Sequence, residues 1–375
     1  MRKNIKKNLT IVLYITISML IILAGIFAYF KISYEVDKEK SMFITNSEAV
    51  ELFGYKDKET TQLDISSFID NIKKIQVNKL YVEVVNDSVS LFESEYYTTR
   101  DFVTTNLTNG FDFLQMFIKS CKDNKIEVYA WLKPLNLGSG ANFNLSILDS
   151  NSDYFVYEEN YYLTPSSMTS QNLINSIVSE IITRYSFDGV LFDDFAYISN
   201  LIKSDNYLEE FEKKSYDKYQ LVYNTTPDIR QWRIDSLSTI LRTTYRITNN
   251  KKIKLSVCVN NNSTYNDSNF VDTQKWLNQV GYADTVVIKL VDNYENINDF
   301  KSEIQKLFTG RISYKTDIEI CLSLQNNINT IDLQKKYCER YFYNYGYTSY
   351  SYTQPSYYSE ELYDMEIVNK NLSKI

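Results

Sequence analysis

Two adjacent carboxylates, Asp193 and Asp194, are the residues of this chain best placed to do chemistry. They follow an apolar run of strand length, residues 189–192, which comes directly after an Asp-Gly turn signal. Upstream, apolar residues recur at spacings of three and four over residues 171–185, which predicts an amphipathic helix. Helix, turn, buried strand and terminal carboxylates form one step of a parallel α/β fold, in which the C-terminal ends of the strands hold the chemistry. Paired carboxylates there indicate acid–base work on a sugar bond, or a cation site.

The two aspartates are expected to differ in orientation, because consecutive residues of a strand point to opposite faces. Asp194 falls on the side of Val190 and Phe192, and Asp193 on the side of Leu191. Only one of them can point straight into a barrel mouth unless the chain bends, and the other would orient neighbouring groups. If both approached one sugar, their repulsion would raise one pKa, which suits a general acid. The alternative is that the aspartates cap the next loop or helix.

Glycoside hydrolysis usually needs a second carboxylate, about 5–5.5 Å away for retention or ~6.5–9.5 Å for inversion. The candidates are Glu83, inside the apolar run 81–85, Asp87 just after it, and Asp292 after the sixth expected strand, for which a turn is the alternative. A charge among apolar neighbours is costly unless paired, so Glu83 either faces the lumen as a site residue or pairs with Lys133 or Lys289. Lys289 is itself a lone charge in an apolar strand, and we expect it to balance one of the two adjacent aspartates.

The composition excludes several classes of site. Histidine is absent from the 375 residues, which excludes Ser-His-Asp and Cys-His nucleophiles, His-ligated metals and imidazole catalysis. Metal-dependent deacetylation is disfavoured for the same reason. The four cysteines form no CxxC pair, which predicts neither a zinc site nor a disulfide scaffold. The net charge of -7, without a basic block, argues against nucleic acid as a partner. We expect no metal ion and no cofactor.

The elements that would position these side chains repeat along the chain. Apolar or β-branched runs alternate with helical patterns, which predicts a (β/α)8 TIM barrel over residues 41–375 without a second domain. Three long polar stretches follow the second, third and fourth strands and would lie on the catalytic face. The expected strands span 41–50, 79–85, 126–132, 189–195, 253–260, 284–291, 318–325 and 346–352. The expected helices span 64–76, 109–124, 171–185, 230–248, 271–280, 297–308 and 329–344.

Residues 1–30 are expected to be a basic cytoplasmic start followed by a transmembrane signal anchor. Four basic residues precede an uncharged, mostly apolar stretch over 9–30, and about 20 residues at ~1.5 Å each span a hydrocarbon core roughly 30 Å thick. The basic start should stay in the cytoplasm, which makes the rest a single-pass protein with an extracytoplasmic domain. A cleaved signal peptide is the alternative, although the run is long for one. Residues 31–40 would form a short stalk.

The chain resembles the glycosyl-hydrolase-like barrel family typified by bacterial envelope proteins. The resemblance is collinear from about residue 41 to 353, and residues 188–195 (DGVLFDDF) are its most specific part. That segment is also similar to the strand-four motif in the C-terminal hydrolase domain of the poly-N-acetylglucosamine deacetylases. The resemblance implies a barrel fold and a polysaccharide or oligosaccharide substrate at the cell envelope. The other matching segments are 129–134 (YAWLKP), 163–165 (LTP), 231–235 (QWRID) and 281–284 (GYAD).

The chain departs from the family pattern at the ends of three strands. Lys133 stands where the family usually has Asn, Asn260 ends a segment that replaces an SPFG-like one, and Lys289 lies in place of a PQxYW-like one. These positions would line the cleft, so we expect them to bind substrate together with Asp87 and Trp131. An indole at a barrel mouth is a natural platform for a sugar ring, with a core or rim tryptophan as the alternative.

Two hypotheses follow. The first is a membrane-anchored glycoside hydrolase acting on an envelope or surface polysaccharide, with Asp193, Asp194 and Glu83 as the catalytic carboxylates. The second is a catalytically degraded barrel that binds glycan or scaffolds envelope assembly, which the altered strand ends favour.

Overall fold

The computed structural model describes residues 16–25, 39–150, 152–198, 200, 207–290, 296–307, 315–322, 328–341 and 344–347. The chain falls into two compact units, residues 1–39 and 40–375. In the first unit, residues 16–25 are helical. Within the described ranges, no helix combines the length and the apolar character needed to cross a bilayer. Most of the expected anchor (1–30) and stalk (31–40) lies outside the described residues, so both stay predictions.

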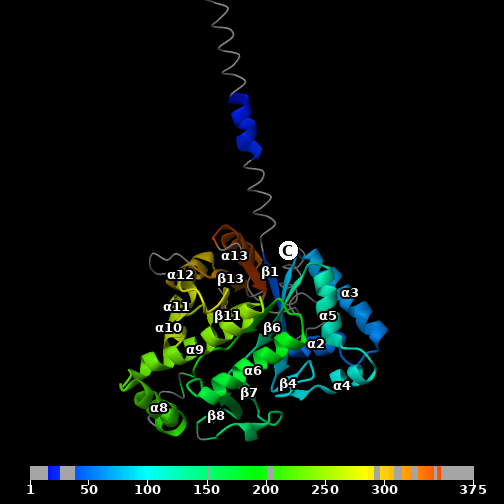
Figure 1. Ribbon diagram of the computed structural model, residues 1–375. Helices are drawn as coiled ribbons and strands as arrows, with labels where there is room; N and C mark the ends of the chain where they lie inside the picture. The colour runs from blue at the N-terminus through cyan, green and yellow to red at the C-terminus, as the bar shows by residue number, and fades with distance from the viewer. Residues whose placement is uncertain are drawn as a thin grey trace, which may run out of the picture. The chain divides into compact units, whose positions relative to one another are not determined.

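The second unit is built on eight parallel strands that close into a barrel, as the sequence predicts (Figure 1). Going round, the strand order is β1-β14-β13-β12-β11-β10-β6-β2. Each strand overlaps one of the expected runs. The expected strand 41–50 was wrong in its second half, because β1 ends at Ile44 and a helix begins at Asn46. The barrel strands are β1 Lys40–Ile44, β2 Lys79–Glu83, β6 Glu127–Leu132, β10 Gly189–Phe192, β11 Lys254–Asn260, β12 Thr285–Lys289, β13 Asp317–Leu322 and β14 Asn344–Tyr347.

Helices connect successive strands and cover the outside of the barrel (Figure 1). Seven of them match the helices expected from periodicity: α3 Lys58–Lys74, α5 Phe113–Asp123, α6 Met168–Arg184, α9 Ile229–Asn250, α11 Thr273–Asn278, α12 Ile297–Leu307 and α13 Ile328–Tyr341. Short or polar segments that carried no clear periodicity add α2 Asn46–Phe53, α4 Asp101–Thr108, α8 Lys213–Tyr223, α10 Ser263–Ser268 and the π-helical turn η2 Leu208–Glu212.

The long stretches after β2 and β6 fold into two small sheets. The first contains β3 (Val85–Asn86), β4 (Val89–Ser90) and β5 (Thr98–Thr99). The second is antiparallel and contains β7 (Asn136–Gly138), β9 (Asn160–Leu163) and β8 (Tyr154–Tyr157). Both follow the C-terminal ends of barrel strands, and Figure 1 shows β4, β7 and β8 gathered at the same end of the barrel. They therefore surround the mouth that the sequence assigns to chemistry.

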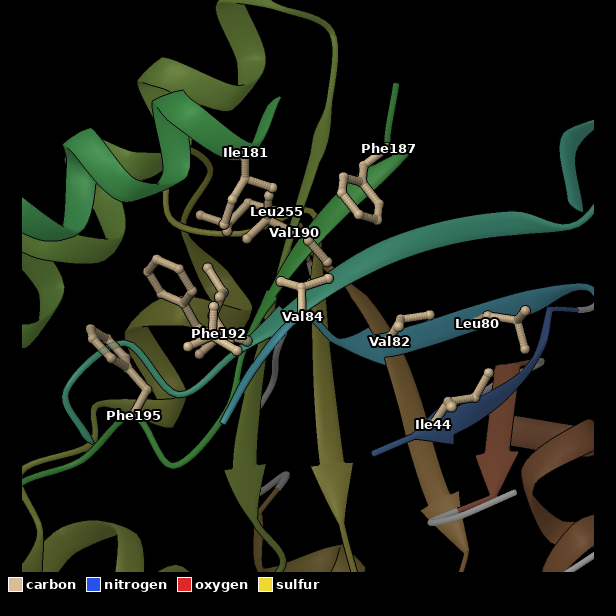
Figure 2. Packing of buried hydrophobic residues seen from close by; sticks show 14 of the residues in the cluster. Ile44, Leu80, Val82, Val84, Ile181, Phe187, Val190, Phe192, Phe195 and Leu255 are labelled. Atoms are coloured by element: carbon tan, nitrogen blue, oxygen red, sulfur yellow. The ribbon is translucent and has the colours of Figure 1, made fainter. Parts of the chain in front are cut away.

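Alternation along the strands divides the apolar side chains into two cores. The outer core lies between sheet and helices, where Ile181 of α6 packs near Val190 of β10 and Leu255 of β11 (Figure 2). The inner core fills the lumen and is rich in aromatic rings. Its members are Phe43, Tyr81, Tyr129, Trp131, Leu191, Cys258, Val287 and Cys321. Leu191 therefore faces the lumen while Val190 faces the helices, as the alternation predicts.

The Asp188-Gly189 pair has a packing role beyond a turn. A Cβ atom on Gly189 would lie 2.1 Å from the ring of Tyr129, so only glycine lets β10 approach β6 here. The side chain of Asp188 accepts a hydrogen bond from the N–H of Val128 at 2.9 Å, which ties the start of β10 to the same neighbour. This close approach positions the strand that ends in the two aspartates.

A buried ion pair lies near the N-terminal ends of the strands. Lys79 Nζ and Glu319 Oε2 are 3.2 Å apart, and the two side chains are 1 % and 0 % exposed. Ser41 and Tyr81 donate hydrogen bonds to the same carboxylate, the second over 2.9 Å. The ammonium group also lies 4.6 Å from the centre of the Tyr129 ring. The charges on β2 and β13 thus compensate each other across the lumen.

Candidate active site

Asp193 leaves β10 on the lumen side and forms a buried ion pair. Its carboxylate Oδ2 lies 2.7 Å from Nζ of Lys289, which ends β12, and Asp193 is 2 % exposed. Its backbone N–H donates to the carbonyl of Leu132, at the end of β6, over 2.8 Å. The structure thus resolves the expectation for Lys289: of the two adjacent aspartates, it pairs with Asp193.

Asp194 reaches the same mouth because the chain bends at this residue. Its φ of +48° lies in the left-handed region, which aspartate tolerates better than most residues. Asp193 Oδ1 accepts the backbone N–H of Asp194 over 3.0 Å and so stabilises the bend. Strict strand alternation would have turned Asp194 toward the helices. The bend leaves its carboxylate exposed instead, beside that of Asp193.

The environment of Asp194 favours its protonated form. Although the residue is accessible at the mouth, loss of surrounding water and then repulsion from Asp193 raise the pKa of its carboxyl. The ammonium groups of Lys289 and Lys133 oppose this rise, and the charge of Glu83 adds to it. In the described part of the chain, the Asp194 carboxylate has no hydrogen-bond or ion-pair partner. It is therefore the carboxyl of this mouth best suited to donate a proton.

The side chain of Glu83 faces the lumen and also pairs with Lys133, so the two placements expected as alternatives occur together. Its Oε1 lies 2.9 Å from Nζ of Lys133, and its Oε2 accepts the backbone N–H of Asn46 over 3.0 Å. Burial lowers the pKa of the Lys133 ammonium group, but the attraction and hydrogen bond of Glu83, together with the charges of Asp194 and Asp193, raise it above its usual value. The ends of β2 and β6 thus supply a second lysine–carboxylate pair, and Glu83 is close enough to act on Asp194 electrostatically.

Trp131 forms part of the floor beneath these pairs. It is 5 % exposed, meets Phe43 edge to face with ring centres 5.1 Å apart, and lies 5.6 Å from the ammonium groups of both Lys133 and Lys289. A sugar could stack on this ring only after its neighbours moved. The arrangement supports the core alternative, and a stacking role stays a prediction.

A small pocket opens beside the two aspartates. Its volume is about 80 Å³, and Lys289, Asn260 and Tyr265 are among the residues that line it together with the aspartates. That is room for two or three water molecules at ~30 Å³ each. Asn260 also holds the following loop, since its side-chain oxygen accepts the N–H of Asn262 over 2.8 Å.

Asp87 lies in the insertion after β2 and organises loops. It forms the β3–β4 turn with Ser88, and both residues have positive φ, +49° and +55°. Its carboxylate accepts the N–H of Ser139 over 2.6 Å. It lines a pocket of about 220 Å³ together with Lys133. The structure therefore places Asp87 near the Lys133–Glu83 pair, and substrate binding by this residue stays a prediction. Asp292 lies outside the described residues.

Two tyrosines near Asp194 were not expected from the sequence. Tyr162 of β9 and Tyr265 of α10 both respond to its charge: burial and then the Asp194 carboxylate raise the pKa of each phenol. Both come from insertions without a clear pattern, in a chain with 33 tyrosines. Nothing in the sequence separates them from the others.

A further buried ion pair, between Arg233 and Glu212, lies behind the residues that follow Asp194. Arg233 of α9 donates to Glu212 Oε2, with its Nε at 2.7 Å. Tyr197 and Ser166 donate to the other carboxylate oxygen over 3.0 and 3.1 Å. Burial raises the pKa of Glu212, although Arg233 opposes the rise. The QWRID segment thus supplies Arg233, which is linked through Glu212 to Tyr197, a residue that follows β10.

Comparison with known proteins agrees with this architecture. The family model for Glycosyl hydrolase-like 10 matches residues 38–339. The glycosyl hydrolase DigH of Escherichia coli K12 is 24 % identical over 179 residues, which cover 44 % of this chain and 40 % of DigH. The glycosyl hydrolase YngK of Bacillus subtilis is 20 % identical over 201 residues, covering 50 % of this chain and 37 % of YngK. The chain thus spans well under half the length of these relatives.

Among solved structures, the glycoside hydrolase domain of PgaB (BpsB) from Bordetella bronchiseptica superposes with a TM-score of 0.57 at 12 % identity. The superposition covers 89 % of this chain and 99 % of that domain. At this identity the likeness concerns the fold.

Proposed function

The chain belongs to the glycosyl hydrolase-like 10 family, and we propose that it hydrolyses glycosidic bonds of a cell-envelope polysaccharide. The proposal rests on one observation: an exposed carboxyl with a raised pKa, Asp194, lies beside the lysine-paired Asp193 at the mouth of a closed barrel. Glycoside hydrolysis needs a proton donor next to a fixed negative charge, and this pair supplies both.

In the proposed reaction, Asp194 donates its proton to the glycosidic oxygen as the bond from that oxygen to the anomeric carbon breaks. Positive charge develops on the anomeric carbon, and the nearby carboxylate of Asp193 stabilises it. The oxygen of a water molecule then bonds to that carbon, and the water proton passes to Glu83. Each of the two products gains one new hydroxyl at the cleaved bond, and Glu83 then releases its proton while Asp194 takes one up from solvent, which restores the starting state.

We also propose that residues 1–30 anchor the barrel on the outer side of the cytoplasmic membrane. Support comes from the basic start and the uncharged apolar stretch over 9–30. This location would bring the mouth to envelope glycans, and protease accessibility of the barrel in intact cells tests it.

The test of activity uses the full chain in detergent, with peptidoglycan and β-linked polymers of N-acetylglucosamine and of glucosamine as substrates. Newly formed reducing ends report cleavage. We expect cleavage by the wild type and none by Asp193→Asn or Asp194→Asn variants whose circular dichroism is unchanged. Equal cleavage by wild type and variants would refute the assignment.

A specific observation favours the second candidate function, glycan binding without cleavage. Glu83 and Asp193 each form an ion pair with a lysine. The positive charge of the lysine compensates that of the carboxylate, which weakens each carboxylate as a base or nucleophile. Binding of the same polymers by the wild type without any reducing ends would support this alternative.

A further inference from the structure

The two lysine–carboxylate pairs at the mouth are not equivalent with respect to Asp194. Lys133 pairs with Glu83 on the neighbouring strand β2, whereas Lys289 reaches across to Asp193, the residue adjacent to Asp194 in sequence. The Asp193 carboxylate in turn accepts the N–H of Asp194. Lys289, Asp193 and Asp194 are thus linked by contacts of 2.7 and 3.0 Å.

Lys289 is held in place on more than one side. Its ammonium group lies 5.5 Å from the centre of the Phe43 ring and 5.6 Å from that of Trp131. Burial lowers the pKa of Lys289, but the attraction of Asp193, together with smaller contributions from Cys258 and Asp194, raises it above its usual value. The lysine therefore stays charged, and its position fixes a positive charge beside one particular aspartate.

We propose that Lys289 decides which of the two adjacent aspartates carries the catalytic proton. By pairing with Asp193, it keeps that buried carboxylate anionic and leaves the proton to Asp194. Lys289 is a positioning residue that acts through Asp193. The catalytic consequence rests on the proposed function, whereas the order in which the two carboxyls bind protons can be measured without a substrate.

The charged and titratable groups around Asp194 come from several elements. They are Asp193 after β10, Lys289 on β12, Lys133 after β6, Glu83 on β2, Tyr162 on β9 and Tyr265 on α10. Of the two cations, only Lys289 is in contact with Asp193. The thiols of Cys258 on β11 and Cys321 on β13 also lie near this pair, and burial raises the pKa of both, so they stay neutral. Without it, Asp193 would be a buried carboxylate beside a second carboxylate, and such a group takes up a proton. Asp194 would then remain anionic to lower pH.

The test measures proton binding directly in the full chain. Carbon-13 spectra of carboxyl-labelled aspartate are recorded against pH, and signals are assigned by their loss in Asp193→Asn and Asp194→Asn. In the wild type and in Lys289→Arg, we expect Asp194 to take up its proton at higher pH than Asp193. In Lys289→Met we expect the reverse order. If Lys289→Met does not fold, Lys289→Gln replaces it, because glutamine keeps a hydrogen-bond donor without the charge. The same reversed order is expected for that variant.

Lys133→Met is the matched control, because it removes an equal charge from the same mouth but from the Glu83 pair. The order of the aspartates should remain that of the wild type. An unchanged order in both Lys289→Met and Lys289→Gln, or a reversed order in Lys133→Met, overturns the inference.

Activity provides the second readout. If Asp194 is the acid, Lys289→Met should lower the rate about 100-fold or more at neutral pH and move the fall on the alkaline side of the pH profile to lower pH. Lys289→Arg keeps the positive charge, so its pH profile should be that of the wild type. A wild type that cleaves no glycan but shows the expected reversal in Lys289→Met would refute the proposed function and leave the role of Lys289 intact.

Discussion

Removal of the lysine at the N-terminal end of the lumen should destabilise the whole barrel. Lys79 and Glu319 are almost completely buried and 3.2 Å apart, so a Lys79→Met change leaves a carboxylate in the core without its counter-charge. Breaking a buried pair in this way costs about 3–5 kcal/mol. Tyr81 and Ser41 would still donate hydrogen bonds to Glu319, which favours the lower end of that range.

A loss of ~3 kcal/mol in the free energy of unfolding corresponds to a fall in Tm of roughly 4 °C for the unit of residues 40–375, at about 2.1 cal/mol/K of unfolding entropy per residue. Urea denaturation followed by far-ultraviolet circular dichroism measures the free energy, and calorimetry measures Tm. The slope of unfolding against urea should not change, because the fold is the same.

The double variant Lys79→Met/Glu319→Gln is the control for charge. It removes both charges, so we expect it to regain at least half of the lost stability. A loss below ~1 kcal/mol in Lys79→Met, or a double variant no more stable than the single one, would refute the view that charge compensation holds these two strands together.

Further predictions concern the mouth and its supports. Asp194→Asn should lower kcat/KM about 100-fold or more while leaving glycan affinity within a few-fold, as measured by reducing-end release and calorimetry. Because Asp194 must be protonated to donate and its pKa is raised, kcat/KM should fall on the alkaline side as pH rises through that raised value; a pH profile of kcat/KM without this alkaline fall would contradict the assignment. Gly189→Ala should cost about 1–3 kcal/mol or more through the clash with Tyr129, measured by urea unfolding. Gly110→Ala is the comparison without a clash: its Cβ meets nothing within 4 Å, and its cost comes from the positive φ of +78° alone. Arg233→Ala should cost about 3–5 kcal/mol by stranding Glu212, and Arg233→Ala/Glu212→Gln should recover part of that loss in the same assay.

The barrel could be predicted from the sequence because each strand is a short apolar run with its own helical partner. Strand alternation also grouped Asp193 with Leu191 on one side of the strand, and the isolated charge of Lys289 indicated a partner among the aspartates. These inferences rest on the spacing of apolar and charged residues along a strand or helix, which is the same in the folded barrel as in the sequence.

The rest of the site depends on features that have no local pattern. The left-handed backbone at Asp194 is compatible with aspartate but not marked by it, so the exposure of this carboxyl could not be derived. The pairing of Glu83 with Lys133 required the register of β2 against β6. Tyr162 and Tyr265 lie in insertions whose paths follow from tertiary packing. The close approach at Gly189 similarly depends on a ring from another strand.

The left-handed residue at the end of β10 has a mechanical consequence. Because the backbone hydrogen bond to Asp193 and the reversal at Asp194 join two successive residues, both carboxyl groups are carried by a single strand end. Breathing of the barrel that shifts β10 relative to its neighbours would displace the pair together and preserve its spacing. The same motion would change the distance between the Asp193 carboxylate and the Lys289 ammonium group, because Lys289 lies on a different strand, β12.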